Sequence, residues 1–263
     1  MEGGPLQKAI HQLWDELADF PASRTDEALL LLMRRLSEWL DAGDVVWIGA
    51  ARLRQGAAAR RDPQSGWRGL VVRHLNLNPV IAQRSLQAAR EQDTDPGMTT
   101  RAIVADAGRF RIHRLQGGFV DMEAFRQTAH YRAFYADAGI VDRMFLGMPI
   151  NADTESFFLL DRMTGHRPFT DADAEVLAEV MRGLKWFHRE LLLSHGLILA
   201  DHPLTSMERR IVALLLTERT EKEIAQELSQ SPTTTHKYIT GIFRKFGVRG
   251  RTGLMALWLG RSS

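Results

Sequence analysis

The sequence predicts an α+β protein, in which a mixed N-terminal domain with a central antiparallel sheet flanked by helices precedes a small all-α domain of four helices. Over the first two hundred residues, short segments rich in Val, Ile and Trp alternate with helical patterns. The last sixty residues instead carry closely spaced helix-start signals. The length of 263 residues also exceeds that of one typical domain, so two domains are expected.

The composition is that of an ordinary folded protein, with 44% hydrophobic and 25% charged residues. Because there is no cysteine, disulfides, iron–sulfur clusters and cysteine zinc sites are excluded. No apolar run approaches the roughly 18 residues of a membrane span, and the opening MEGGPLQ lacks a basic segment leading into an apolar stretch. We therefore expect a cytoplasmic protein.

The first ninety residues are predicted to form three helices and a strand hairpin. Pro21 separates the first two helices, and Asn78 followed by Pro79 is a helix cap with a first-turn proline. The expected helices cover residues 6–20, 26–42 and 78–91, and the expected strands cover 44–53 and 67–75.

The middle of the chain is predicted to complete the sheet. Strands are expected at 102–105 and 110–115, followed by a helix with an aromatic face at 121–136. A polar turn then joins two central strands, at 141–150 and 156–162.

One long helix is expected from Thr170 to His195, because Thr170 and Asp173 form a capping pattern and apolar residues follow at helical spacing. A second apolar stripe, with Leu177 and Met181, widens its surface. Two interpretations stay open, a core helix and a dimer contact that also transmits signals. The residues of the dimer and signal interpretation are Val176, Val180, Leu184, Phe187 and Leu191.

A domain boundary is predicted after Gly196, which ends the long helix. We expect a sensor and dimerisation domain at residues 1–196, a linker at 197–203 and a helical domain at 204–263. From His202 onward there are 10 Lys and Arg against 5 Asp and Glu. Such a surplus suits nucleic acid when a motif accompanies it, although by itself it is usually a solvated surface.

The motif lies in three successive helix starts. Thr205 with Glu208 and Thr220 with Glu223 each place a glutamate three residues after a hydroxyl cap, and Ser231 precedes a first-turn proline. A tight turn at 229–230 separates the second and third helices, which is the layout of a helix-turn-helix. The residues spaced to build its core are Ile211, Leu214, Leu215, Ile224, Ala225, Leu228, Ile239, Ile242, Phe243 and Phe246.

The segment from about Pro203 to Gly260 resembles the LuxR-type DNA-binding domain. The matching residues are Leu204, Thr205, Glu208, Leu214, Leu215, Lys222, Glu223, Ile224, Ala225, Leu228, Ser231, Thr234, Ile242, Lys245, Gly247, Val248 and Arg251. The resemblance implies a transcription regulator that binds double-stranded DNA as a homodimer, with residues 232–246 as the recognition helix in the major groove and RNA polymerase as a further candidate partner.

By position in the family pattern, base edges are expected to be contacted by His236, Lys237 and Thr240. Phosphates are expected to be contacted by Lys222, Thr233, Thr234, Arg244 and Lys245. The sequence departs from the pattern at Glu218, Thr235, His236 and Tyr238, where glycine, valine, lysine and histidine respectively are usual or common. An alternative for His236 is a solvated surface residue.

The N-terminal domain resembles a GAF or PAS domain, through the run 157–160, the segment Pro168-Phe169-Thr170 and Asp173 leading into the last helix. The autoinducer-binding domain is a related mixed fold. A phosphorylated receiver domain is not expected, because Asp44 precedes its strand and no acidic pair follows it.

Aromatic residues of this domain are candidates to line a pocket for a small apolar or aromatic effector, and the alternative is that most of them belong to the core. They are Trp47, Trp67, Phe110, Phe125, Tyr131, Phe134, Tyr135 and Phe145. The alternatives are a domain that binds a protein partner and has no ligand, and an enzymatic sensor or a haem sensor with His113 or His130 as ligand. Nucleophile, metalloprotease, phosphate-loop and dinucleotide motifs are lacking, so we expect no catalytic residue, metal or cofactor.

Overall fold

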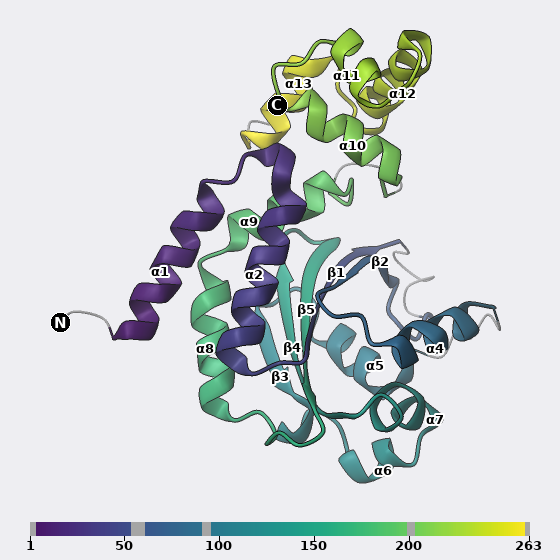
Figure 1. The fold of residues 1–263 in the computed structure, drawn as a ribbon. Coiled ribbons are helices and arrows are strands. Elements are labelled where there is room, and N and C mark those ends of the chain that lie inside the picture. Colours follow the sequence, from purple (N-terminus) through teal and green to yellow (C-terminus); the bar gives the residue numbers. More distant parts are fainter. Residues whose placement is uncertain (1–3, 54–60, 91–95, 199–202, 261–263) are drawn as a thin grey trace. The chain divides into compact units, whose positions relative to one another are not determined.

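The computed structural model describes residues 4–53, 61–90, 96–198 and 203–260 (Figure 1). The chain divides into two compact units. One unit, the sheet unit, is Leu30–Lys185, and the other, the helical unit, combines Met1–Leu29 with Trp186–Ser263. The predicted α+β class is confirmed, since one sheet and many helices make up the described chain.

The sheet is antiparallel, with five strands in the order β2-β1-β5-β4-β3. The strands are β1 (Asp44–Arg52), β2 (Trp67–His74), β3 (Arg111–Arg114), β4 (Ile140–Pro149) and β5 (Thr154–Met163). β1 and β2 form the predicted hairpin, and β5 lies at the centre between β1 and β4. Valine, isoleucine and aromatic residues favour this pleated, buried environment.

Helices precede, interrupt and follow the sheet in the sequence. In the first part of the chain they are α1 (Pro5–Ala18), η1 (Ala22–Arg24), α2 (Thr25–Leu40), α4 (Pro79–Arg90), α5 (Gly97–Ala105), η2 (Leu115–Gly117), α6 (Met122–Arg126), α7 (Ala129–Tyr131) and η3 (Arg132–Ala136). After the sheet come α8 (Asp171–Arg182), α9 (Lys185–Ser194), α10 (Ser206–Leu215), α11 (Glu221–Glu227), α12 (Pro232–Lys245) and α13 (Arg251–Trp258). The predicted cap of α4 is present, since the Asn78 side chain accepts from the Val80 amide at 2.9 Å.

Helices cover both faces of the sheet. In Figure 1, α8 lies on one side of the strands, and α5 and α7 lie on the other. Because side chains alternate along a strand, Trp47 and Ile48 of β1 point to opposite faces. Trp47 is fully buried, and its indole Nε1 donates to Ser156 Oγ at 2.8 Å. Ile48 faces the side of α5, where the cavity described below is found.

Three predicted elements were wrong in type or extent. Residues 102–105 belong to helix α5, because a short apolar run fits a buried helix as well as a strand. The helix expected at 121–136 is broken into α6, α7 and η3, since Thr128 starts a new cap by accepting from the Tyr131 amide. The long helix from Thr170 is two helices, because α8 ends at Gly183, a poor helix former. Its predicted capping box, Thr170 with Asp173, is confirmed.

Candidate nucleic-acid interface and ligand cavity

Three capped helices, α10, α11 and α12, build the C-terminal domain together with α13. Thr205 accepts from the Glu208 amide, and Glu208 Oε2 accepts in return from the Thr205 amide at 2.8 Å. Thr220 and Glu223 form the same reciprocal pair at the start of α11. Ser231 caps α12 by accepting from the Thr234 amide at 3.1 Å. All three predicted helix starts are therefore confirmed.

The turn between α11 and α12 is tight. Ser229 has a φ of +53°, in the left-handed region, and the Gln230 amide donates back to the Ala225 carbonyl at 2.9 Å. This ends α11 and lets α12 begin two residues later. The helix pair is the predicted helix-turn-helix.

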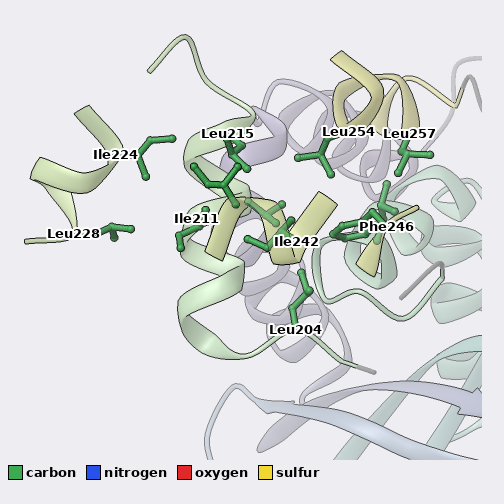
Figure 2. Close-up of a cluster of buried hydrophobic side chains, with 12 residues drawn as sticks. Leu204, Ile211, Leu215, Ile224, Leu228, Ile242, Phe246, Leu254 and Leu257 are labelled. Carbon is green, nitrogen blue, oxygen red and sulfur yellow. The ribbon is translucent and has the colours of Figure 1, made fainter. Parts of the chain in front are cut away.

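A single apolar core holds these helices together, and Figure 2 shows its side chains converging from α10, α11, α12 and α13. Ala225 is also buried. Thr235, where valine is usual in the family pattern, is buried too, and its hydroxyl donates to Gln230 Oε1 at 3.3 Å. The labelled core residues are Leu204, Ile211, Leu215, Ile224, Leu228, Ile242, Phe246, Leu254 and Leu257.

The outer surface of α12 is polar. His236, Lys237 and Thr240 are exposed, as the sequence analysis expected for side chains that reach base edges. Four of the five predicted phosphate contacts, Lys222, Thr233, Thr234 and Arg244, are exposed as well. Such a set of donors on one helix and its neighbours matches what phosphates and base edges accept.

Lys245 differs from these residues, because its ammonium is already bound. Lys245 Nζ lies 2.7 Å from Glu208 Oε1 and 2.8 Å from Oε2. Burial works against ionisation of Glu208, but the bonds from Lys245 and Thr205 outweigh it and lower the pKa of Glu208. Lys245 thus ties the end of α12 to the start of α10.

Two polar contacts of this domain are not predicted by the sequence pattern. Arg251 Nε donates to the Leu215 carbonyl at 2.8 Å, which satisfies an otherwise open helix end. Glu221 Oε2 lies 3.0 Å from His236 Nδ1. Glu221 and His236 are fifteen residues apart and on different helices, so no sequence spacing predicts their contact.

A cavity of about 210 Å³ lies in the sheet unit, between the sheet and the helical segments α5, α7 and η3. Its wall is largely apolar and aromatic. The lining residues are Ile48, Ala50, Gln64, Trp67, Arg68, Gly69, Thr99, Thr100, Ile103, Val104, His130, Tyr135, Arg143, Phe145, Phe157 and Leu159.

Both arginines that line the cavity are paired with carboxylates of the protein, since Arg68 lies 2.9 Å from Asp62 and Arg143 binds Asp161. Arg143 binds Asp161 through two parallel hydrogen bonds, one of them 2.7 Å from Nη2 to Oδ2. Its Nη1 also donates to the Tyr135 hydroxyl at 3.2 Å, and its guanidinium lies 4.7 Å from the centre of the Tyr135 ring. Burial raises the pKa of Tyr135, so its hydroxyl stays protonated.

Trp67 supplies an open hydrogen-bond donor. The side chain is 4% exposed and lines the cavity, and its Nε1 is buried without a hydrogen-bond partner among the described residues. A buried indole N–H normally has a partner, because leaving it unpaired costs about 1–3 kcal/mol. A ligand with an acceptor oxygen would satisfy this donor.

Residues 202–258 match the family model described as bacterial regulatory proteins, luxR family. The C-terminal domain is a LuxR-type helix-turn-helix domain. It is 43% identical over 49 residues to the spore germination protein GerE of Bacillus subtilis (strain 168). That alignment covers 19% of this chain and 66% of GerE, just under two thirds of its length.

Two solved structures align with more of the chain. SdiA in complex with octanoyl-rac-glycerol superposes with a TM-score of 0.50 at 12% identity, over 97% of this chain and 95% of SdiA. The LBD domain of VqsR from Pseudomonas aeruginosa gives a TM-score of 0.45 at 14% identity, over 73% of this chain and 98% of that domain. The likeness to SdiA shows that the sheet ahead of the LuxR-type domain has an SdiA-like fold.

The aromatic residues expected to form one pocket are in fact dispersed. Trp67, Tyr135 and Phe145 line the cavity, whereas Trp47 points to the opposite face of the sheet. Phe125, Tyr131 and Phe134 pack in the core cluster beside α6 and η3, and Phe110 lies under the guanidinium of Arg182 at 4.4 Å. Their role as pocket residues stays a prediction.

The residues of the predicted dimer and signal helix are mostly buried within the chain. Val180, Leu184, Phe187 and Leu191 are buried, and Val176 is partly buried. Val176 and Val180 lie in α8, Phe187 and Leu191 lie in α9, and Leu184 lies in the turn between the two helices. Of the predicted linker, residues 199–202 lie outside the described residues, and the domain limits at 196 and 204 stay predictions.

The two histidines of the haem alternative occupy different surroundings. His113 stacks on Phe119 with ring centres 4.4 Å apart, and burial lowers the pKa of His113. His130 lines the cavity, and its ring packs at a tilt against that of Phe134, with ring centres 4.9 Å apart. Across the described ranges, no group of three or more His, Asp or Glu side chains is arranged to hold a metal ion. The same ranges contain no helix that is both long and apolar enough to cross a membrane.

Proposed function

We propose that this protein is a transcription regulator that binds double-stranded DNA through α12 and responds to a small molecule in the cavity of the sheet unit. The proposal of DNA binding is supported by the LuxR-type domain, whose α12 presents polar side chains to solvent. We assign base-edge contacts to His236, Lys237 and Thr240. We assign phosphate contacts to Lys222, Thr233, Thr234, Arg244 and Lys245, of which Lys245 contributes least because Glu208 offsets its charge.

The effector we propose is compact, uncharged and partly apolar. A volume of about 210 Å³ falls below the roughly 300–1,000 Å³ of pockets for drug-sized ligands, so a small molecule fits best. Since Asp161 neutralises Arg143, the cavity offers no open charge to an ionic ligand from that pair. The Trp67 N–H would bind a carbonyl or hydroxyl oxygen.

We further propose that the protein acts in the cytoplasm as a homodimer, with α8 and α9 as the route by which effector binding reaches α12. Dimers of helix-turn-helix domains read two half-sites one helical turn apart, about 34–36 Å. Light scattering of the free and the DNA-bound protein tests this proposal. A monomer in both samples would exclude the dimer.

The dependence of duplex affinity on salt concentration tests the proposed DNA binding. If about six to ten phosphates are neutralised, affinity for a fluorescent duplex falls by roughly 10³ to 10⁵ between 50 mM and 200 mM salt. An affinity that is unchanged over this range of salt concentration would contradict the proposed phosphate contacts. Anisotropy titrations at four salt concentrations give the slope.

Native mass spectrometry tests the effector. A co-purified ligand appears as added mass on the folded protein that is lost on denaturation. The matched variant Trp67→Phe keeps the ring but removes the N–H, and it is expected to lose the adduct. A clean wild-type mass, together with no thermal shift from a broad panel of neutral metabolites, would favour a protein partner for this domain.

A further inference from the structure

His236 and Glu221 form a surface pair at the edge of the recognition helix. His236 lies in the second turn of α12 with a side chain 66% exposed, and Glu221 opens α11 with a side chain 50% exposed. His236 Nδ1 lies 3.0 Å from Glu221 Oε2. The pair therefore joins the two helices of the helix-turn-helix on the surface that we propose faces DNA.

The contact dictates where the imidazole carries its hydrogen. An ionised carboxylate only accepts hydrogen bonds, so Nδ1 must be the donor. In a neutral ring the hydrogen is then on Nδ1 and Nε2 is a bare acceptor. While this contact is made, the ring nitrogen that points away from Glu221 is that acceptor.

We propose that Glu221 is a positioning residue for sequence recognition, which holds His236 in the form that accepts a hydrogen bond from a base. In the major groove the only amine donors are N4 of cytosine and N6 of adenine. His236 thus selects cytosine or adenine at the base it touches. A lysine at this position, as is common in the family pattern, only donates and would select guanine. This inference rests on the proposed function, because it requires α12 to lie in the major groove.

Glu221 also carries a cost for DNA binding. Its negative charge lies on the proposed DNA surface and repels phosphates, which lowers affinity for every sequence. An acidic residue in the first turn of a helix is favoured by the helix dipole as well, so Glu221 has a structural explanation too. The two roles separate experimentally, because only the positioning role changes the preference at one base.

The test is selection of duplexes from a randomised pool at pH 8. The contacted position is the one whose preference is lost in His236→Ala. We expect the wild type to enrich cytosine or adenine there by about fivefold, the discrimination that one ordinary hydrogen bond provides. Glu221→Ala is expected to reduce this preference while raising affinity for all sequences, and His236→Lys to replace it with guanine.

Glu227→Gln is the matched control, since Glu227 is on the same helix but pairs with Arg219. It is expected to leave the preference unchanged. Enrichment of guanine by the wild type, or a preference unaltered in Glu221→Ala, would overturn the positioning role. A wild type that enriches no sequence at all would instead refute the proposed function, so the two failures are distinguishable.

Discussion

The LuxR-type domain and the sheet unit distribute their polar groups in opposite ways. The LuxR-type domain fills its interior with apolar side chains and keeps Lys237 and Arg244 of α12 exposed. The sheet unit buries two guanidinium–carboxylate pairs, Arg143 with Asp161 and Arg111 with Glu155, on the cavity face of its sheet. The exposed face of a DNA-binding helix can be predicted from the spacing of residues in the sequence. The lining of a cavity cannot, because it depends on strands that are distant in the sequence and are brought together by the fold.

The largest expected effect breaks a buried pair in the sheet unit. Asp161→Ala leaves Arg143 charged and unpaired, and should lower the free energy of unfolding by about 3–5 kcal/mol. Replacing both partners, as in Asp161→Leu with Arg143→Met, should recover most of the loss. Urea unfolding monitored by tryptophan fluorescence measures both. A single variant that loses less than about 1 kcal/mol would show that the pair is not buried as described.

The corresponding change in the LuxR-type domain removes an apolar side chain. Ile242 is fully buried, so Ile242→Ala should cost about 2–5 kcal/mol through lost burial and a residual cavity. Met255 is 41% exposed, and Met255→Ala serves as the matched control, with an expected change within about 0.5 kcal/mol. Circular dichroism during thermal unfolding reports the helices. Equal effects of the two variants would contradict the core in Figure 2.

Acid should destabilise the protein through a buried histidine of the helical unit. Burial lowers the pKa of His188, in the helical unit, from 6.5 to about 3. Between pH 6.5 and about pH 3, His188 is therefore protonated in the unfolded chain but neutral in the folded chain. The free energy of unfolding falls as the pH drops through this range. The expected slope is about 1.4 kcal/mol per pH unit. His188→Gln should flatten the slope in urea titrations at pH 7, 6, 5 and 4, and an unchanged slope would assign the acid sensitivity elsewhere.

The smallest expected effect concerns a helix cap. Thr220→Ala removes the acceptor for the Glu223 amide and should cost about 1 kcal/mol. The exposed Thr252 is the control, and Thr252→Ala is expected to change stability by less than half as much. Amide exchange of α11 measures the difference most locally. Loss of protection in the sheet unit instead would contradict its separation from the LuxR-type domain.

Features that depend on residues close together in the sequence could be predicted, whereas those that depend on distant segments could not. Thr205, Thr220 and Ser231 were correctly predicted as caps because each bonds to an amide three residues away. Residues 102–105 were wrongly predicted as a strand, because only packing against the sheet decides the structure of a short apolar run. Gly183 was not predicted to interrupt the helix, since glycine is tolerated within many helices.

The same limit on prediction applies to the proposed DNA-binding surface and to the cavity. The exposed face of α12 was predicted from helical position alone. The contact of His236 with Glu221, and that of Arg143 with Asp161, each require two elements to be aligned by the fold. The Trp67 N–H, which has no partner among the described residues, is likewise a property of the packed interior. These contacts carry the finer specificity that we propose for DNA and effector.

The central claim is that α12 reads DNA, and Lys237→Ala tests it most directly. Anisotropy titrations would compare wild type, Lys237→Ala and the charge-matched control Lys185→Ala on one selected duplex and one random duplex. We expect Lys237→Ala to bind the selected duplex more weakly by about 1–3 kcal/mol and to lose discrimination, while Lys185→Ala binds as the wild type does. If Lys237→Ala bound both duplexes as tightly as the wild type, α12 would not be the recognition helix.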